Sequence, residues 1–128
     1  YIFDRELIDY LDLALWDSAQ VVREGPFRGK TMLSLFTELP RKGVRLGTAG
    51  KIMSAKRAGE LLDEGCDFVL IARAGILQRD FPLQVKANPT YDSPRLPVPA
   101  EYLRERGLSE RFIDHMRGWQ TFVLHGSR

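Results

Sequence analysis

The sequence predicts an α/β fold built on parallel strands. Residues 44–77, VRLGTAGKIMSAKRAGELLDEGCDFVLIARAGIL, follow the order strand, glycine turn, helix, strand, turn. The apolar run at residues 68–72 has no polar interruption, which is typical of a strand buried on both faces of a parallel sheet. Because a covering helix joins the two strands, their carboxyl ends are expected at the same edge of the sheet.

A helix is expected between these two strands. Ser54 offers a side-chain oxygen for its N-cap, and Ala58, Leu61 and Leu62 recur at the spacing of one helical face. Gly65 is expected to close this helix.

The turns after the two strands form the candidate binding site. Ala49, Gly50 and Lys51 follow the first strand, and Ala72 and Arg73 follow the second. Their backbone N–H groups are expected to converge on a small concavity suited to a phosphate, with cationic side chains beside it. Arg73 is the strongest polar candidate, because an arginine that ends an apolar strand is placed for bidentate contact with an anion. A salt bridge from Arg73 to a neighbouring carboxylate is the alternative.

The motifs GTAGKI and CDFVLIARAGILQRDFP resemble the end of the FMN-dependent NADH:flavin oxidoreductase family, the Old Yellow Enzyme relatives. Upstream, DYLDLALWD and FRGKTMLSLF are similar to the same family, and so is the FP-x-x-V segment downstream, so the resemblance covers most of the chain. It implies the C-terminal portion, about strands 6–8, of a TIM (β/α)8 barrel, followed by a C-terminal helical extension. Where the family usually has glycine before its arginine, this sequence has Ala72.

The resemblance also implies a chemistry. Ala49, Gly50, Lys51, Ala72 and Arg73 would bind the phosphate of FMN, in a parent enzyme that transfers hydride from NAD(P)H to a small-molecule acceptor such as an activated alkene. The family's substrate-orienting histidines and tyrosine come from earlier strands, and the sequence shows no recognisable catalytic group, so the chain alone is expected to be inactive. The alternatives are a non-catalytic phosphate-binding half-barrel, part of another phosphate-binding TIM-barrel enzyme, or a purely structural fragment.

The elements before the central unit are expected in this order: the end of a helix at residues 1–8, a strand at 9–15, a loop at 18–30, a helix at 31–39 and a charged turn at 41–43. Trp16 stands where the first strand meets its loop, and a packed ring is favoured there over a pocket wall.

The elements after the central unit are mostly helical. Asp80 is expected to cap a short helix, and the proline-rich residues 88–99 to form a connector. Pro99 is expected to begin a helix ending at Gly107, and Ser109 to cap a last helix. The apolar side of that last helix would include Phe112, Ile113, Met116 and Trp119. The expected division is therefore a partial barrel at 1–87, a connector at 88–99 and C-terminal helices at 100–128.

Length and composition limit the remaining possibilities. The chain has 128 residues and begins with Tyr1, so we expect a piece of a longer polypeptide, about half of the ~250 residues of a complete barrel. A net charge of +2 without a basic stripe argues against nucleic acid, and no apolar run is long enough to cross a membrane. His115 and His125 lack partners at metal spacing, so no metal is expected.

The single cysteine indicates the compartment of the protein, and the open sheet edges indicate that it associates with another chain. Cys66 is the single cysteine and begins the apolar run, so a buried structural thiol in a reducing, cytoplasmic setting is expected. Open parallel edges invite pairing, so we also expect a homo-oligomer or dependence on a missing N-terminal half of the barrel.

Overall fold

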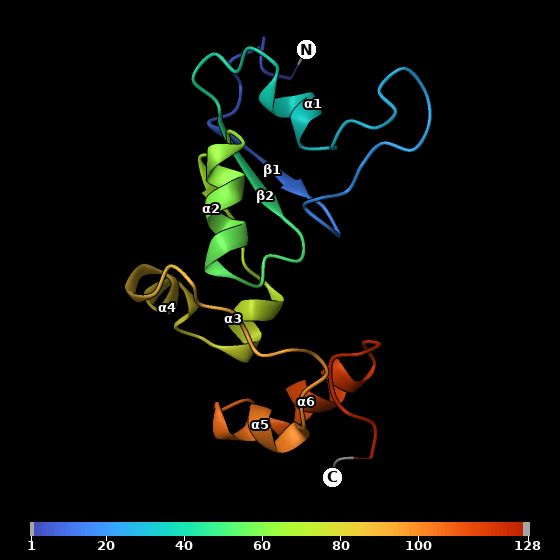
Figure 1. Ribbon diagram of the computed structural model, residues 1–128, viewed down its shortest axis with the longest axis vertical. Coiled ribbons are helices and arrows are strands. Elements are labelled where there is room, and N and C mark those ends of the chain that lie inside the picture. Colours follow the sequence, from blue (N-terminus) through green and yellow to red (C-terminus); the bar gives the residue numbers. More distant parts are fainter. Residues whose placement is uncertain (1, 127–128) are drawn as a thin grey trace.

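The computed structural model describes residues 2–126 (Figure 1). Its elements in chain order are β1 (Tyr10–Ala14), α1 (Ser34–Thr37), β2 (Arg45–Ala49), α2 (Ala55–Asp63), β3 (Phe68–Val69), α3 (Arg73–Leu77), α4 (Phe81–Ala87), α5 (Ala100–Glu105) and α6 (Glu110–Arg117). Within the same residues, no helix is long and apolar enough to cross a membrane.

The sheet is parallel, with the strand order β1-β2-β3. Strands β1 and β2 pair from Tyr10 opposite Arg45 to Ala14 opposite Ala49, whereas β3 pairs with β2 over two residues only. The strands thus follow one another in sequence order, and the carboxyl ends of β2 and β3 lie at the same edge.

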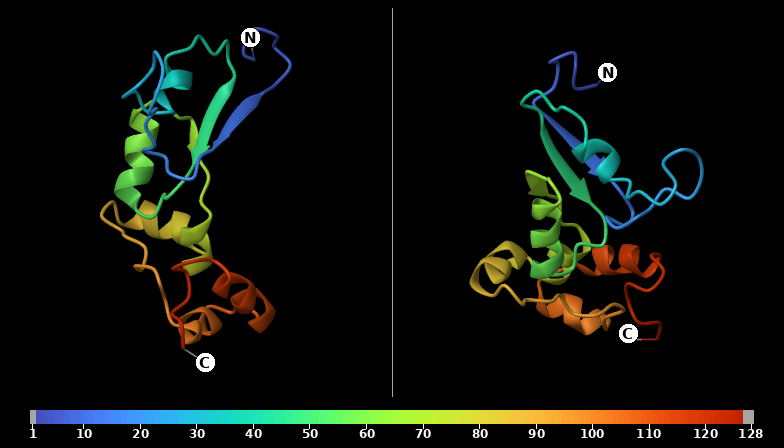
Figure 2. Two further views of the ribbon diagram at one scale, coloured as in Figure 1. Left: turned by 90° about the vertical axis from the view of Figure 1, so that its right-hand side faces the viewer. Right: turned by 45° about the horizontal axis from the view of Figure 1, so that its top comes forward.

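Helices α1 and α2 lie on one side of the sheet (Figure 2). The buried residues of this layer are Leu13, Leu33, Leu46, Ile52, Ala58, Leu61 and Cys66. The Ser54 hydroxyl caps α2 by accepting a hydrogen bond from the Arg57 N–H at 3.1 Å, and Gly65 follows the helix with a φ of +115°. The expected cap and the expected end of α2 are both confirmed.

The opposite face of the sheet has no covering helix in the described chain (Figure 2). The Tyr10 and Phe68 rings meet there edge to face, with centroids 5.9 Å apart. A Cβ on Gly47 would lie 2.1 Å from the Phe68 ring, so only glycine leaves room for it. Tyr10 is nevertheless 62% exposed, which leaves apolar surface on this face open to solvent.

The C-terminal helices form a second hydrophobic cluster. Its buried members are Leu77, Val98, Ala100, Leu103, Ile113, Met116, Phe122 and Val123. The Ser109 hydroxyl accepts a hydrogen bond from the Phe112 N–H at 3.3 Å, as expected for the cap of α6. Pro99 was expected to be the first residue of the next-to-last helix, but it is the N-cap of α5, which begins one residue later at Ala100.

The prediction of a TIM-barrel portion is wrong. In the described residues the structure has a three-stranded open sheet, and helices α4, α5 and α6 gather beyond its end rather than around it (Figure 1). A barrel requires each strand to be followed by a helix that covers the sheet. Here the apolar sides of α5 and α6 pack on each other, so they leave the sheet uncovered.

Several element boundaries also differ from expectation. The strand expected at 68–72 is only Phe68–Val69, and α3, which was not expected, begins at Arg73. The helix expected at 31–39 is confined to Ser34–Thr37, and residues 2–5 form a turn instead of the end of a helix.

Asp80 stands at the N-cap position of α4 without capping it. Its carboxylate instead accepts hydrogen bonds from the side-chain amides of Gln78 and Gln84.

Candidate functional site

The two predicted turns line a single hollow. Ala49, Gly50, Lys51, Ala72 and Arg73 all border this space, the turn hollow, which has a volume of about 160 Å³. They meet because β2 and β3 are adjacent and parallel, so the chain leaves both strands at the same edge. The structure therefore brings together every residue of the site predicted from sequence.

The turn after β2 has an unusual backbone. Gly50 has a φ of +123° and Lys51 a φ of +49°, so two consecutive residues adopt conformations that are uncommon for residues with a side chain. A Cβ on Gly50 would lie 2.6 Å from the Leu15 carbonyl oxygen and 2.7 Å from the Ser18 nitrogen. The Ser18 N–H also donates a hydrogen bond to the Gly50 carbonyl at 3.0 Å. Glycine is thus required at position 50 by the loop that follows β1.

Four backbone amides at the turn hollow have no acceptor within the protein. Within residues 2–126, the N–H groups of Gly50, Lys51, Ala72 and Arg73 donate to no backbone or side-chain oxygen. Ala49 differs, because it is paired with Ala14 in the β1–β2 ladder. Lys51 and Ala72 are exposed and Gly50 and Arg73 are half-buried, so these four free donors are available to a ligand or to water.

Two cationic side chains flank these amides. The Arg73 guanidinium carbon lies 5.4 Å from the centre of the Trp16 ring, and no carboxylate of the described residues is within ion-pair distance of it. The salt bridge considered for Arg73 is therefore not formed. Lys51 instead lies 3.1 Å from the Asp17 carboxylate, a half-exposed pair. The Ala19 N–H first, and Lys51 second, lower the pKa of Asp17 below its usual value.

Two larger hollows share lining residues with the turn hollow. Both are bordered by Lys51, Arg73 and Leu96, with volumes of about 570 Å³ and about 480 Å³. Trp16 and Trp119 border the first of them and also the turn hollow. Lys51 and Arg73 therefore stand where all three spaces meet.

The expectation of a packed Trp16 is wrong, because the residue is 71% exposed. Trp119, expected on the apolar side of the last helix, lies beyond the end of α6. The sequence contained a signal that α6 ends before Trp119, because Gly118 directly precedes it and glycine favours the end of a helix. Leu96 and Met53 were also missed, and nothing in their local sequence indicates a site.

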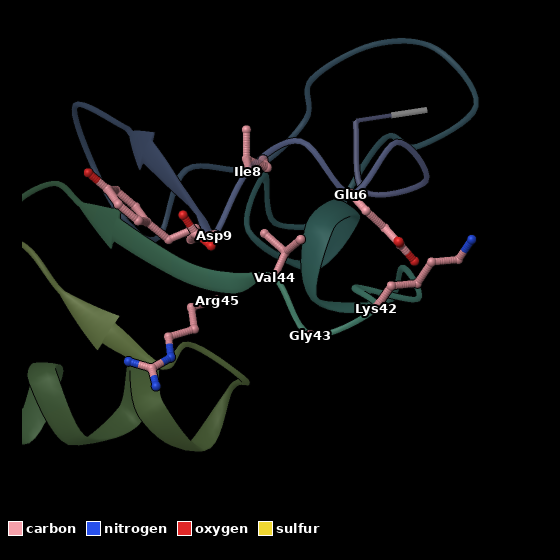
Figure 3. Close-up of a pocket in the computed structure, with 8 residues that line it drawn as sticks. Glu6, Ile8, Asp9, Lys42, Gly43, Val44 and Arg45 are labelled. Carbon is pink, nitrogen blue, oxygen red and sulfur yellow. The ribbon is translucent and has the colours of Figure 1, made fainter.

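Another hollow, of about 520 Å³, lies at the opposite edge of the sheet, where β1 and β2 begin (Figure 3). Charged groups of both signs border it, including Glu6, Asp9, Lys42 and Arg45. None of the five predicted residues reaches it. In residues 2–126 no group of three His, Cys, Asp or Glu side chains could hold a metal ion. The turn hollow is therefore the better candidate site.

Cys66, at the far end of β3, is buried and lies outside all of these hollows. Burial raises the pKa of its thiol, which keeps the thiol protonated and unreactive at neutral pH.

Comparison of this chain with protein-family models, with curated proteins and with solved structures gives no match. The likeness to NADH:flavin oxidoreductases therefore rests on the sequence motifs alone.

Proposed function

We propose that this chain binds the phosphate of FMN and supplies that part of the cofactor site in an FMN-dependent NAD(P)H:flavin oxidoreductase. The observation that carries the proposal is the turn hollow, because Arg73 and the residues of all four unpaired amides line this one space. Converging backbone N–H groups beside a guanidinium group suit a phosphate, because they offer several donors and a positive charge without an acceptor.

The dimensions of the site fit the phosphate end of such a ligand. A volume of about 160 Å³ is below the ~300–1,000 Å³ of a typical ligand pocket. The rest of the ligand must therefore extend outside the turn hollow, and the space bordered by Lys51 and Arg73 is open for it.

When bound, FMN supplies the hydride chemistry between NAD(P)H and an acceptor such as an activated alkene. The residues of this chain bind and orient the phosphate: Gly50, Lys51, Ala72 and Arg73 through their N–H groups, and Arg73 also through its guanidinium group. We place the protein in the cytoplasm as part of this proposal, since its one cysteine is unpaired.

A second candidate is a phosphate-binding module without catalysis. The small volume of the turn hollow favours it, because the hollow alone accommodates a phosphate and no ring system. In that case any phosphorylated small molecule would bind about as well as FMN.

Isothermal titration calorimetry with FMN, riboflavin, a sugar phosphate and inorganic phosphate tests these proposals. FMN is expected to bind most tightly, and Arg73→Ala to weaken it about tenfold or more, since charged hydrogen bonds contribute ~1.5–3 kcal/mol each. Arg23→Ala is the matched control, because Arg23 is an exposed arginine that borders none of the three hollows.

Three outcomes would contradict the proposal or favour its rival. Equal binding of FMN and riboflavin would contradict a phosphate site. Equal binding of FMN and the sugar phosphate would favour the non-catalytic module. Sustained NADPH oxidation with an enone by this chain alone would contradict the expectation that its catalytic groups lie elsewhere.

A further inference from the structure

Two tryptophans are exposed at the border of the turn hollow. The Trp16 side chain is 71% exposed and the Trp119 side chain 42% exposed. These are the two tryptophans of the sequence, and both border the turn hollow and the adjoining hollow of about 570 Å³. Tryptophan is highly buried on average, so two open rings at one site leave apolar surface for which the fold provides no cover.

The two rings are positioned by different parts of the chain. Trp119 contacts Phe122 and His115 edge to face, with ring centroids 6.5 Å and 6.2 Å apart, and Phe122 is only 1% exposed. Trp16, in the loop after β1, is contacted by the Arg73 guanidinium group. The buried Phe122 thus anchors one ring, and the arginine of the proposed phosphate site positions the other.

The aromatic and the cationic side chains lie around the same two hollows. Lys51 and Arg73 border the same two hollows as Trp16 and Trp119. If the phosphate of a ligand occupied the turn hollow, these four side chains would be neighbours of the rest of the ligand.

We infer that Trp16 and Trp119 form an aromatic slot, and that this slot selects a planar ring carrying a phosphate, as in FMN, over a sugar phosphate. The inference rests on the proposed function and assigns its ring specificity to these two residues. A flat aromatic ring system can stack its whole face on an indole ring, whereas a sugar ring offers only the C–H groups of one face, so the larger contact favours the aromatic ligand. The positive charges of Lys51 and Arg73 complement the phosphate attached to such a ring.

The test uses the whole chain with FMN, riboflavin and inorganic phosphate as separate probes. A flavin ring stacked on an indole loses its fluorescence, so binding to the wild type is expected to quench flavin emission. Trp16→Ala is expected to weaken FMN and riboflavin about tenfold and to abolish the quenching, since aromatic stacking on a base has that magnitude. The affinity for inorganic phosphate should stay within about twofold of the wild type.

The variants are chosen to separate ring contact from folding. Trp16 is largely exposed, so Trp16→Ala should fold, and Trp16→Phe should restore part of the flavin affinity because it retains an aromatic face. Trp119→Ala should also weaken the binding of FMN and riboflavin and reduce the quenching of flavin emission. Phe27→Ala is the matched control, because Phe27 is an exposed aromatic residue that borders none of the three hollows.

The outcomes distinguish this inference from the proposed function. If riboflavin binds in a Trp16-dependent manner but inorganic phosphate does not bind, the slot is supported and the phosphate site is refuted. If phosphate binds and Trp16→Ala leaves FMN affinity and flavin emission unchanged, the slot is refuted and the phosphate site stands. If neither flavin binds, the slot is refuted.

Discussion

Replacing Gly50 by alanine tests the geometry on which the candidate site depends. The new Cβ would lie 2.6 Å from the Leu15 carbonyl oxygen, 2.7 Å from the Ser18 nitrogen and 2.9 Å from the Asp17 carbonyl carbon. All three are backbone atoms, so no side chain can rotate away to relieve the overlap. The loop after β1 must move, and the hydrogen bond from the Ser18 N–H to the Gly50 carbonyl, 3.0 Å long, is then lost.

The expected loss of stability follows from two contributions. A φ of +123° is unfavourable for alanine and costs about 1–3 kcal/mol, even where space is available. Loss of the Ser18 hydrogen bond adds about 0.5–1.5 kcal/mol. The free energy of unfolding should therefore fall by about 1.5–4.5 kcal/mol, a large part of the ~5–15 kcal/mol of an ordinary domain.

Urea denaturation followed by circular dichroism measures this loss. Gly25→Ala is the matched control, because Gly25 also has a positive φ, +79°, but a Cβ added there would have no atom within 4 Å. Gly25→Ala should therefore cost only the backbone strain, about 1–2 kcal/mol. Equal losses for the two variants would refute the close approach of the β1 loop to the Gly50 turn.

Further predictions follow from the rest of the fold. Gly59→Ala, on an open face of α2, should raise the free energy of unfolding by about 0.5–1 kcal/mol in the same urea experiment. The Leu46 N–H and then Arg41 lower the pKa of Asp67, so Asp67→Asn should destabilise the protein at neutral pH, and its difference from the wild type should shrink as the pH falls below about 4 in parallel urea titrations. The buried Cys66 thiol should react with DTNB only after unfolding. Light scattering should detect self-association, because one sheet face and the edges are open; a monomer that unfolds cooperatively would count against it.

Local sequence signals predicted both ends of α2 and the start of α6, but not the ends of α1 or the start of α4. Ser54 and Ser109 both cap the helices that they were expected to cap, and Gly65 follows α2 with a positive φ. A capping interaction joins residues three positions apart, so its whole geometry is contained in a short stretch of sequence. The order of the three strands was also predicted correctly, because a helix between two successive strands favours their pairing as parallel neighbours.

Contacts between distant residues were not predictable in this way. The apolar run from Phe68 onward fits either a strand or a buried helix, and pairing with β2 decides that only Phe68 and Val69 join the sheet. Whether a sheet closes into a barrel depends on strands and covering helices that no local pattern specifies. The C-terminal helices illustrate this, because their apolar sides fit a sheet equally well but pack around Phe122.

The site nevertheless does not depend on the part of the fold prediction that was wrong. Its five residues meet because two neighbouring strands run parallel, a relation that β2 and β3 have in an open sheet as much as in a closed one. What the open sheet changes is the surroundings: Trp16 and Trp119 border the space beside Arg73 because the loop after β1 and the segment after α6 both reach that edge. Under the proposed function, the local strand–helix–strand unit would set the phosphate contacts, and segments far from it in sequence would set the selection among phosphate ligands. Variants of Arg73 and of Trp16 should consequently alter different properties of binding, total affinity for the anion in one case and preference for an aromatic ring in the other.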